Sequence, residues 1–205
     1  MKLRLAVLIS GGGTTLQNLL DQIHAGKLDA SIECVISNKN GVRGLERAQK
    51  AGIPSFFVPI DKGDPSKASV QIFDICRQYR VELVVLGGFL ALIEIPADFA
   101  HRVINIHPSL IPAFCGTGYY GLKVHQAVLD RGAKITGCTV HFVDDHYDHG
   151  PIILQKAVQV QEGDDAARLA ERVFQVECEA YPEAIRLIAN GRVHVEGGKV
   201  RIAGE

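Results

Sequence analysis

Short apolar segments alternate with helix-like segments along the first half of the chain. The apolar segments are rich in β-branched residues, as strands are, and they are Leu3–Ile9, Ser31–Ser37, Ser55–Val58 and Leu83–Leu86. The helix-like segments between them are Thr14–His24, Val42–Ala51 and Lys67–Tyr79. Alternation of this kind predicts an α/β fold, in which an open, mostly parallel twisted sheet of Rossmann-like type carries helices on both faces.

The pattern changes after Arg102. Val103–Ile106 is a further strand, and the Pro- and Gly-rich loop Pro108–Gly121 follows it. The remaining predicted elements are a helix, two strands, a long helix and a hairpin, at Leu122–Arg131, Thr136–Val143, Ile152–Val158, Asp165–Ala189 and Val193–Ile202. We expect Asp164 to cap the long helix and Pro182 to kink or break it.

We expect one domain over residues 1–205, built of two lobes that share a sheet. Its lobes would be 1–100 and 101–205. Hydrophobic residues make up 47% and charged residues 22%, which is ordinary for a folded soluble protein. A net charge of −1 without a long basic run argues against nucleic acid as a partner. The apolar segments are too short to span a membrane.

Cysteine usage and the start of the chain bear on the compartment. The five cysteines are scattered and form no Cys-x-x-Cys pair, which is typical of reduced thiols in a cytoplasmic protein. A strand that begins at Leu3 leaves no room for a signal peptide. We therefore expect a cytoplasmic monomer or homodimer with small-molecule substrates.

A glycine-rich loop joins the first strand to the first helix. It reads Ser10-Gly11-Gly12-Gly13-Thr14-Thr15, and the common dinucleotide and Walker A patterns both fail here. A helix N-terminus attracts anions, so we predict that the backbone amides from Gly12 to Thr15 and the two threonine hydroxyls hold a phosphate monoester. The alternative is a turn that serves chain reversal alone.

Two further segments supply an amide, an imidazole and a carboxylate. Asn105 and His107 lie two residues apart at the carboxyl end of a predicted strand, so both can face one reacting atom. Pro108 then ends the strand. Asp148 precedes His-Gly-Pro in the acidic turn between the later strands.

These three groups suit acyl transfer to an amine. A fixed amide N–H stabilises an oxyanion, histidine shuttles the proton, and a carboxylate orients the imidazole. The chemistry requires neither a nucleophilic side chain nor a metal, although Asn105, His107, Asp148 and His141 could in principle ligate one. In isolation, a histidine before proline is more often structural, and Asp148 could be a turn former. His141 is expected to be buried and supporting, and His146 and His149 to be exposed.

The chain closely resembles the folate-dependent phosphoribosylglycinamide formyltransferases over nearly its whole length. The matching segments are Ile9-Ser10-Gly11-x-Gly13, Ser37-Asn38-Lys39, Gly44-Leu45-Glu46-Arg47-Ala48, Gly88-Phe89, Asn105–Leu110, His141-Phe142-Val143, Asp148-x-Gly150-Pro151 and Ile153-Leu154-Gln155. The resemblance implies a formyltransferase fold. It also implies transfer of a formyl group from 10-formyltetrahydrofolate, as cosubstrate, to the amino group of glycinamide ribonucleotide in purine (IMP) biosynthesis.

The resemblance implies that lobe 1–100 binds the substrate and its phosphate, and that lobe 101–205 carries catalysis and folate binding. It also implies roles for individual residues. Asn105, His107 and Asp148 match the catalytic trio, and Gly13, Thr14 and Thr15 match the phosphate loop. Glu177 matches an acidic residue that contacts the ribosyl group. The residues implied in folate binding are Lys67, Leu90, Ala91, Leu92, Ile93, Asn105, Val143 and Asp144. Ala91 and Lys67 stand where the family often has arginine.

Three other functions use the same fold or trio. Formyltransferases acting on initiator tRNA or amino sugars carry a similar trio, and the tRNA enzymes have an additional C-terminal domain and need a basic surface. A formyltetrahydrofolate hydrolase would carry an extra N-terminal domain, for which a strand beginning at Leu3 leaves no room. A non-catalytic nucleotide sensor would not need Asn105, His107 and Asp148 together.

Overall fold

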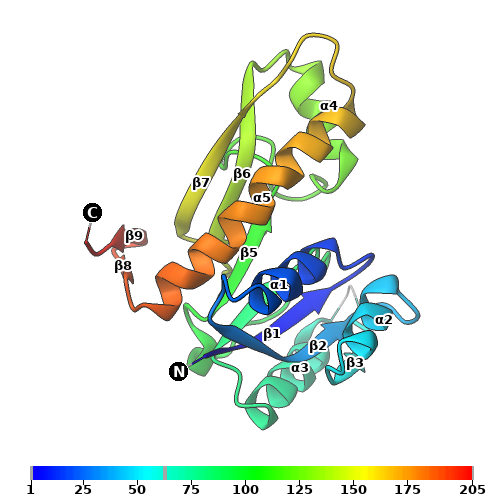
Figure 1. Cartoon of the computed structure of the whole chain (residues 1–205), viewed down its shortest axis with the longest axis vertical. Helices are drawn as coiled ribbons and strands as arrows, with labels where there is room; N and C mark the ends of the chain where they lie inside the picture. The colour runs from blue at the N-terminus through cyan, green and yellow to red at the C-terminus, as the bar shows by residue number, and fades with distance from the viewer. Residues whose placement is uncertain (1, 62–63, 205) are drawn as a thin grey trace. The chain divides into compact units, whose positions relative to one another are not determined.

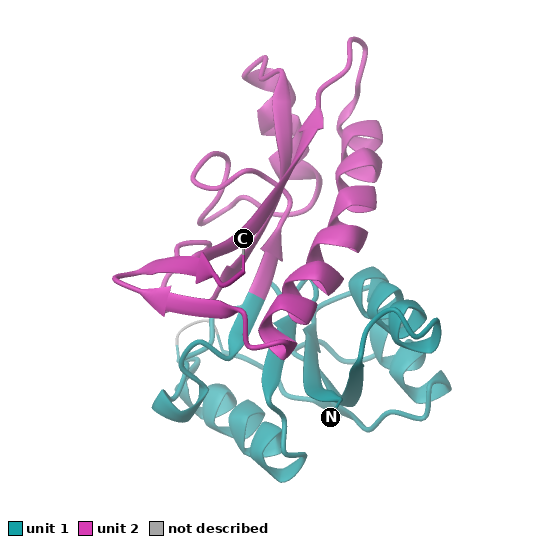
Figure 2. Cartoon of the chain, turned by 60° about the vertical axis from the view of Figure 1, so that its left-hand side comes forward, with its two compact units in different colours: residues 1–104 teal, residues 105–205 magenta. Residues whose placement is uncertain are grey.

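A computed structural model describes residues 2–61 and 64–204 of the chain (Figure 1). These residues form two compact units, unit 1 over residues 1–104 and unit 2 over residues 105–205 (Figure 2). The strand order in the main sheet is β3-β2-β1-β4-β5-β6-β7. This arrangement confirms the predicted α/β class with a mostly parallel sheet. The roles predicted for the two lobes stay predictions.

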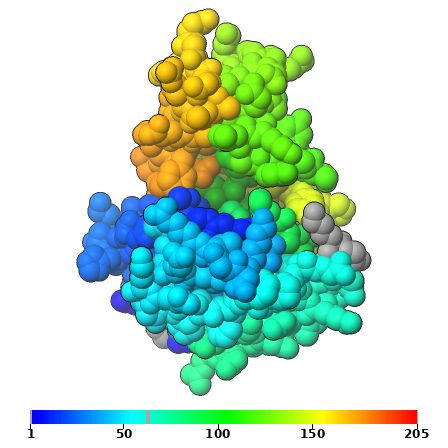
Figure 3. Space-filling view, turned by 90° about the vertical axis from the view of Figure 1, so that its right-hand side faces the viewer, coloured from blue at the N-terminus to red at the C-terminus, as the bar shows by residue number. Residues whose placement is uncertain are grey.

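Unit 1 contains the alternating strands and helices. Its elements are β1 (Leu3–Ile9), α1 (Thr14–His24), β2 (Ala30–Ser37), α2 (Arg43–Lys50), β3 (Ser55–Phe57), α3 (Ser66–Gln78), β4 (Leu83–Leu86) and a 3₁₀ turn at Ala97–Phe99. β1 pairs in parallel with β2 and β4, and β2 pairs in parallel with β3. Helices lie on both sides of these strands (Figure 2). In the space-filling view, α2 and α3 make up much of the visible face of unit 1 (Figure 3).

The core of unit 1 lies along β1 and β4. Leu5 to Ile9 are fully buried, and all four residues of β4 are buried as well. Continuous apolar runs of this kind are the mark of parallel strands covered on both faces. Each buried Leu, Ile or Val side chain stabilises the fold by about 1.5–3 kcal/mol relative to exposure.

Unit 2 contains the remaining elements. They are β5 (Val103–His107), whose first two residues belong to unit 1, α4 (Leu122–Asp130), β6 (Ile135–Phe142), β7 (Ile152–Gln159), α5 (Ala166–Ala189), β8 (Val193–Glu196) and β9 (Lys199–Ile202). β6 and β7 are antiparallel, with a register shift between Val140 and His141. α5 packs on both of these strands. The predicted closing hairpin is confirmed, since β8 pairs with β9 around Gly197 and Gly198.

The expected cap of α5 and a break of the helix at Pro182 were wrong, whereas a kink at Pro182 stays a prediction. Asp165, and not Asp164, is the N-cap, because it immediately precedes the helix and its carboxylate accepts the N–H of Arg168 at 2.8 Å. Asp164 instead accepts two hydrogen bonds from Arg172, at 2.7 and 2.9 Å. Pro182 does not break the helix, which continues to Ala189. Pro182 is buried with neighbours on the same helix, and this packing offsets a cost of about 3 kcal/mol for proline within a helix. No helix in the described part of the chain combines the length and apolarity needed to span a membrane.

Candidate active site

The amide and the imidazole lie at the carboxyl end of β5. The strand ends at His107, and Pro108 follows it, as expected for a residue that cannot continue the ladder. Asn105 Nδ2 lies 3.4 Å from Asp148 Oδ1, and His107 Nδ1 lies 3.4 Å from Asp148 Oδ2. The two side chains therefore face the same carboxylate. The structure brings together the three residues that the sequence singled out.

Asp148 occupies the turn between β6 and β7 and has a left-handed backbone, with φ of 55°. Aspartate is one of the few residues that adopt this conformation readily. Its Oδ2 atom accepts the backbone N–H of Gly116 at 2.9 Å. Gly150 fixes the end of the same turn, because a Cβ there would overlap the carbonyl oxygen of Phe142. The carboxylate is thus held by both the turn and the loop after β5.

The hydrogen bonds of His107 define where it can take up a proton. Its Nε2 atom lies 2.9 Å from the carbonyl oxygen of Phe114, and a carbonyl can only accept, so Nε2 carries a hydrogen. In the neutral ring, Nδ1 is then bare and faces Asp148. Uptake of a proton at Nδ1 converts this contact into a charge-assisted hydrogen bond.

His141 on β6 orients the amide of Asn105. Its Nδ1 atom donates to the carbonyl of Phe142 at 2.8 Å. Its Nε2 atom lies 3.2 Å from Asn105 Nδ2 and 3.7 Å from Asp148 Oδ1, so a neutral ring accepts from the amide and a protonated ring donates to the carboxylate. The side chain is 1% exposed, as expected for a buried supporting histidine. The second N–H of the amide points to Asp148 over the longer distance of 3.4 Å, so it is the one that a substrate oxygen can capture.

Burial and the neighbouring charges act in opposite directions on the pKa values of His107 and Asp148. Burial lowers the pKa of His107, with His141 adding to the effect, and the Asp148 carboxylate and the Phe114 carbonyl oppose it without reversing it. Burial alone would raise the pKa of Asp148, but His141, His107 and the N–H of Gly116 hold that pKa below its usual value. At neutral pH the site therefore contains a neutral imidazole beside a carboxylate, a pair ready to accept a proton.

The loop between β5 and α4 contributes two contacts that sequence reasoning missed, from Phe114 and Gly116. Buried hydrogen bonds tie the base of this loop to β6, because Thr139 Oγ1 donates to Ser109 O at 2.7 Å and accepts from Ile111 N at 3.0 Å. Gln155 on β7 also donates to Ile111 O and to Thr139 Oγ1. Both missed contacts use backbone atoms, which leave no side-chain signal in the sequence.

The glycine-rich loop of unit 1 leads directly into α1. Gly13 has φ of 68°, and a Cβ there would lie 2.7 Å from Gly44 Cα, so only glycine fits. Gly44 N donates to Gly11 O at 3.1 Å, and Arg47 Nε donates to Gly12 O at 2.9 Å. The first turns of α2 thus hold the backbone of the glycine-rich loop through these two hydrogen bonds. The sequence identified Gly44 and Arg47 as part of a matching segment but gave them no role.

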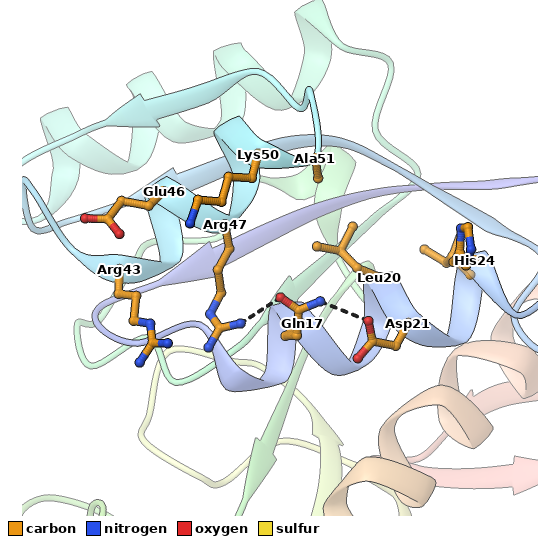
Figure 4. A pocket seen from close by; sticks show the side chains of 10 residues that line it. Gln17, Leu20, Asp21, His24, Arg43, Glu46, Arg47, Lys50 and Ala51 are labelled. Carbon is orange, nitrogen blue, oxygen red and sulfur yellow. Dashed lines mark hydrogen bonds between the residues drawn. The ribbon is translucent and has the colours of Figure 1, made fainter.

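A cavity of about 640 Å³ lies between α1 and α2 (Figure 4). Its charged lining is mixed, with Arg43, Arg47 and Lys50 beside Asp21 and Glu46. Arg47 Nη1 donates to Gln17 Oε1 at 2.7 Å across it. None of the site residues predicted from the sequence lines this cavity, so we do not assign it to the transfer chemistry.

Comparison with known proteins places the chain in a family. Residues 3–185 match the sequence model of the formyl transferases. The chain belongs to the formyl transferase family. A phosphoribosylglycinamide formyltransferase of Vigna unguiculata, described as chloroplastic, is 39% identical over 93% of this chain. The trifunctional purine biosynthetic protein adenosine-3 of Gallus gallus is 40% identical over 97% of it. The chain spans 62% of the Vigna protein and 20% of the Gallus protein.

The solved structures that resemble this chain include proteins of the same family. Glycinamide ribonucleotide transformylase 1 from Symbiobacterium toebii superimposes with a TM-score of 0.88 at 42% identity, over 98% of this chain and 94% of that chain. A formyltetrahydrofolate deformylase from Pseudomonas syringae pv. tomato reaches 0.87 at 30% identity, over 98% of this chain and 66% of that one. The family resemblance found in the sequence is confirmed, and the formyl transferase fold is shared by transferases and deformylases.

Apart from Asn105 on β5, the residues implied in folate binding occupy three segments of this formyl transferase. Lys67 is exposed in the first turn of α3. Leu90, Ala91, Leu92 and Ile93 follow β4 and run from exposed Leu90 to buried Ile93. Val143 and Asp144 follow β6 and are partly buried. Their contacts with folate stay predictions.

Glu177 on α5 is partly exposed, yet desolvation raises the pKa of its carboxyl to about 7. In the unfolded chain this pKa is about 4.3. Below the lower pKa, Glu177 is protonated in both the folded and the unfolded chain, and above the higher pKa it is ionised in both. Ionised Glu177 therefore destabilises the fold progressively as pH rises from about 4.3 to 7, by about 1–3 kcal/mol at pH 8.

Replacing Glu177 by glutamine removes this penalty. We expect Glu177→Gln to raise the melting temperature by several degrees at pH 8 and to leave it nearly unchanged at pH 4.5. Thermal unfolding followed by circular dichroism at both pH values measures the effect. Glu171→Gln, an exposed carboxylate of the same helix, is the matched control. Equal shifts at the two pH values would show that ionisation of Glu177 is not the cause.

Proposed function

We propose that this formyl transferase moves the formyl group of 10-formyltetrahydrofolate to the amino group of N1-(5-phosphoribosyl)glycinamide, in de novo purine biosynthesis. The observation that carries the proposal is the cluster of Asn105, His107 and Asp148. The names of the similar transformylases support the choice of substrate. The substrates are small molecules, and no metal takes part in the proposed transfer.

The cluster would act in three steps. The acceptor amine attacks the formyl carbon, a C–N bond forms, and the carbonyl electrons move to oxygen. The N–H of Asn105 stabilises that oxyanion, a contribution worth about 3–4 kcal/mol for a donor of this kind. His107 takes the amine proton at Nδ1, where Asp148 stabilises the imidazolium, and the proton then passes to the leaving nitrogen of the folate as its bond to carbon breaks. The formyl group and one proton exchange places, with no change in oxidation state.

The rest of the substrate would be held by residues outside the cluster. The amides of Gly12 and Gly13 with Thr14 and Thr15 would bind the phosphate, because these groups form the N-terminus of α1 and its first turn contains no acidic residue. Glu177 would contact the ribosyl group. Lys67, the segment from Leu90 to Ile93, and Val143 with Asp144 would line the folate site.

The cysteines agree with a reducing compartment, and we propose the cytoplasm. Cys34, Cys76 and Cys138 are buried, and none of the five cysteines forms a disulfide within the described part of the chain. The Vigna relative is described as chloroplastic, which is a different compartment. We propose that the protein acts as a monomer or homodimer.

A spectrophotometric assay with 10-formyltetrahydrofolate, in the presence and absence of glycinamide ribonucleotide, tests the proposed function. We expect release of deformylated folate only when the amine is present. Release at the same rate without the amine would instead identify a hydrolase, the activity named for the deformylase structures. Absence of release from a folded sample that still binds folate would overturn both reactions.

A further inference from the structure

The turn between β6 and β7 contains a second group of chemically active side chains, separate from the three that face the proposed transfer. Asp144, His146 and His149 each offer one donor atom, and these atoms all lie within 4.8 Å of one another. Within residues 2–61 and 64–204, no other group of three or more histidine, cysteine or carboxylate side chains brings its donor atoms this close together. The transfer chemistry uses none of the three as an acid, base or oxyanion donor.

Asp144 links the two histidines of the group. Its Oδ2 atom accepts from His149 Nδ1 at 2.7 Å, and its Oδ1 atom accepts the backbone N–H of His146 at 3.0 Å. The rings of His146 and His149 lie 5.4 Å apart between centroids. The side chain of His149 is 71% exposed and that of Asp144 is 34% exposed, so an ion from solvent can reach both.

We propose that Asp144, His146 and His149 form a binding site for one divalent transition-metal ion. Two imidazoles and one carboxylate suit Zn²⁺, Ni²⁺ or Cu²⁺, whereas Mg²⁺ and Ca²⁺ prefer all-oxygen sites. Bonds of about 2.0–2.2 Å in a tetrahedral site place the donor atoms roughly 3.3–3.5 Å apart. Small rotations of three side chains on one short turn achieve this spacing, and a water completes the coordination.

Binding of the ion changes where the His149 ring carries its hydrogen. A protonated His149 ring releases its Nδ1 hydrogen to solvent and retains the one on Nε2, whereas a neutral ring moves its single hydrogen from Nδ1 to Nε2 without a net release. In either case His149 Nδ1 and Asp144 Oδ2 become free to act as ligands. The ion then ties residues 144 and 146 to residue 149. Asp148 lies within this span, so the bound ion restrains the backbone that carries the carboxylate facing His107.

Isothermal titration of the full-length, untagged chain with Zn²⁺ tests the site. We expect one ion per chain. His146→Gln and His149→Gln each lower the affinity by at least about 10- to 100-fold, since even lost outer-shell partners cost this much. The matched control His194→Gln, an exposed histidine on β8, retains wild-type affinity. Mg²⁺ does not compete. Absence of saturable Zn²⁺ binding, or binding that survives both variants, would overturn the proposal.

Two further measurements separate this site from alternatives. Co²⁺ bound to the turn has no thiolate ligand. A thiolate-to-cobalt charge-transfer band would therefore show that a cysteine binds the ion, and would refute the assignment.

Chymotrypsin should cleave after Tyr147, which is 45% exposed within the turn. We expect Zn²⁺ to slow this cleavage in the wild type and in His194→Gln but not in His149→Gln. Equal protection of His149→Gln would also refute it. None of these readouts depends on the proposed transfer reaction.

Discussion

His107→Ala should lower the turnover number for formyl transfer by about 10²–10⁴ while leaving folate affinity within a small factor. The imidazole is 4% exposed and its Nδ1 atom faces Asp148, so the substitution removes the proton carrier of the proposed transfer. Stopped-time assays at saturating substrates measure turnover, and equilibrium titration with a folate measures binding. His194→Ala, far along the sequence on an exposed strand, controls for loss of a histidine.

The wild-type pH profile gives a second readout for His107. Because burial lowers the pKa of this imidazole, the base form should persist below about pH 6.5, and turnover should fall only at more acidic pH. The residual activity of His107→Ala should lack this acidic fall. Near-normal turnover in the variant would remove His107 from the proposed mechanism.

Asp148→Asn should produce a loss of turnover of similar size, about 10²–10⁴. The amide oxygen of asparagine can still accept the N–H of Gly116, so the turn is expected to keep its shape. The negative charge that raises the pKa of His107 is lost, however, and the imidazolium formed during transfer has no counter-charge. The acidic limb of the pH–rate curve should therefore move to lower pH.

Steady-state rates of Asp148→Asn between pH 5 and 9 measure this shift. Asp130→Asn, an exposed carboxylate at the end of α4, is the matched control. A pH–rate curve that coincides with that of the wild type would show that Asp148 and His107 do not act as a pair.

The parts of the fold that sequence predicted best are those defined by local physics. β1, α1 and β4 were predicted with the bounds that the structure has, because apolar runs and the glycine-rich turn define their ends. The end of β5 was predicted one residue early, at Ile106 instead of His107, although Pro108 was expected to end the strand because it cannot extend a ladder. The N-cap of α5 was misplaced by one residue. Asp164 and Asp165 have the same side chain, so residue type does not distinguish them. In the structure Asp165 accepts from Arg168 N and caps the helix, whereas Asp164 accepts from Arg172 and Gln161.

The sequence predicted the residues of the candidate site to a similar extent. Asn105 and His107 follow from strand periodicity. Asp148 was chosen because the chemistry calls for a carboxylate and the resemblance agreed, since no local rule brings a turn to the end of another strand. The carbonyl of Phe114 and the N–H of Gly116 could not be predicted. Their positions depend on the course of a long loop that Thr139 and Gln155 fix from other strands.

The contact between Gly13 and Gly44 divides the glycine-rich loop into two kinds of position. A side chain at 13 would meet Gly44, and one at 44 would meet Ile9 and Gly11. A Cβ at Gly11 or Gly12 would meet nothing within 4 Å. Substitution can therefore enlarge or recharge the loop at residues 11 and 12 without disturbing the backbone. A loop that binds a different anion can therefore be obtained by substitution at residues 11 and 12, whereas Gly13 and Gly44 must remain glycine.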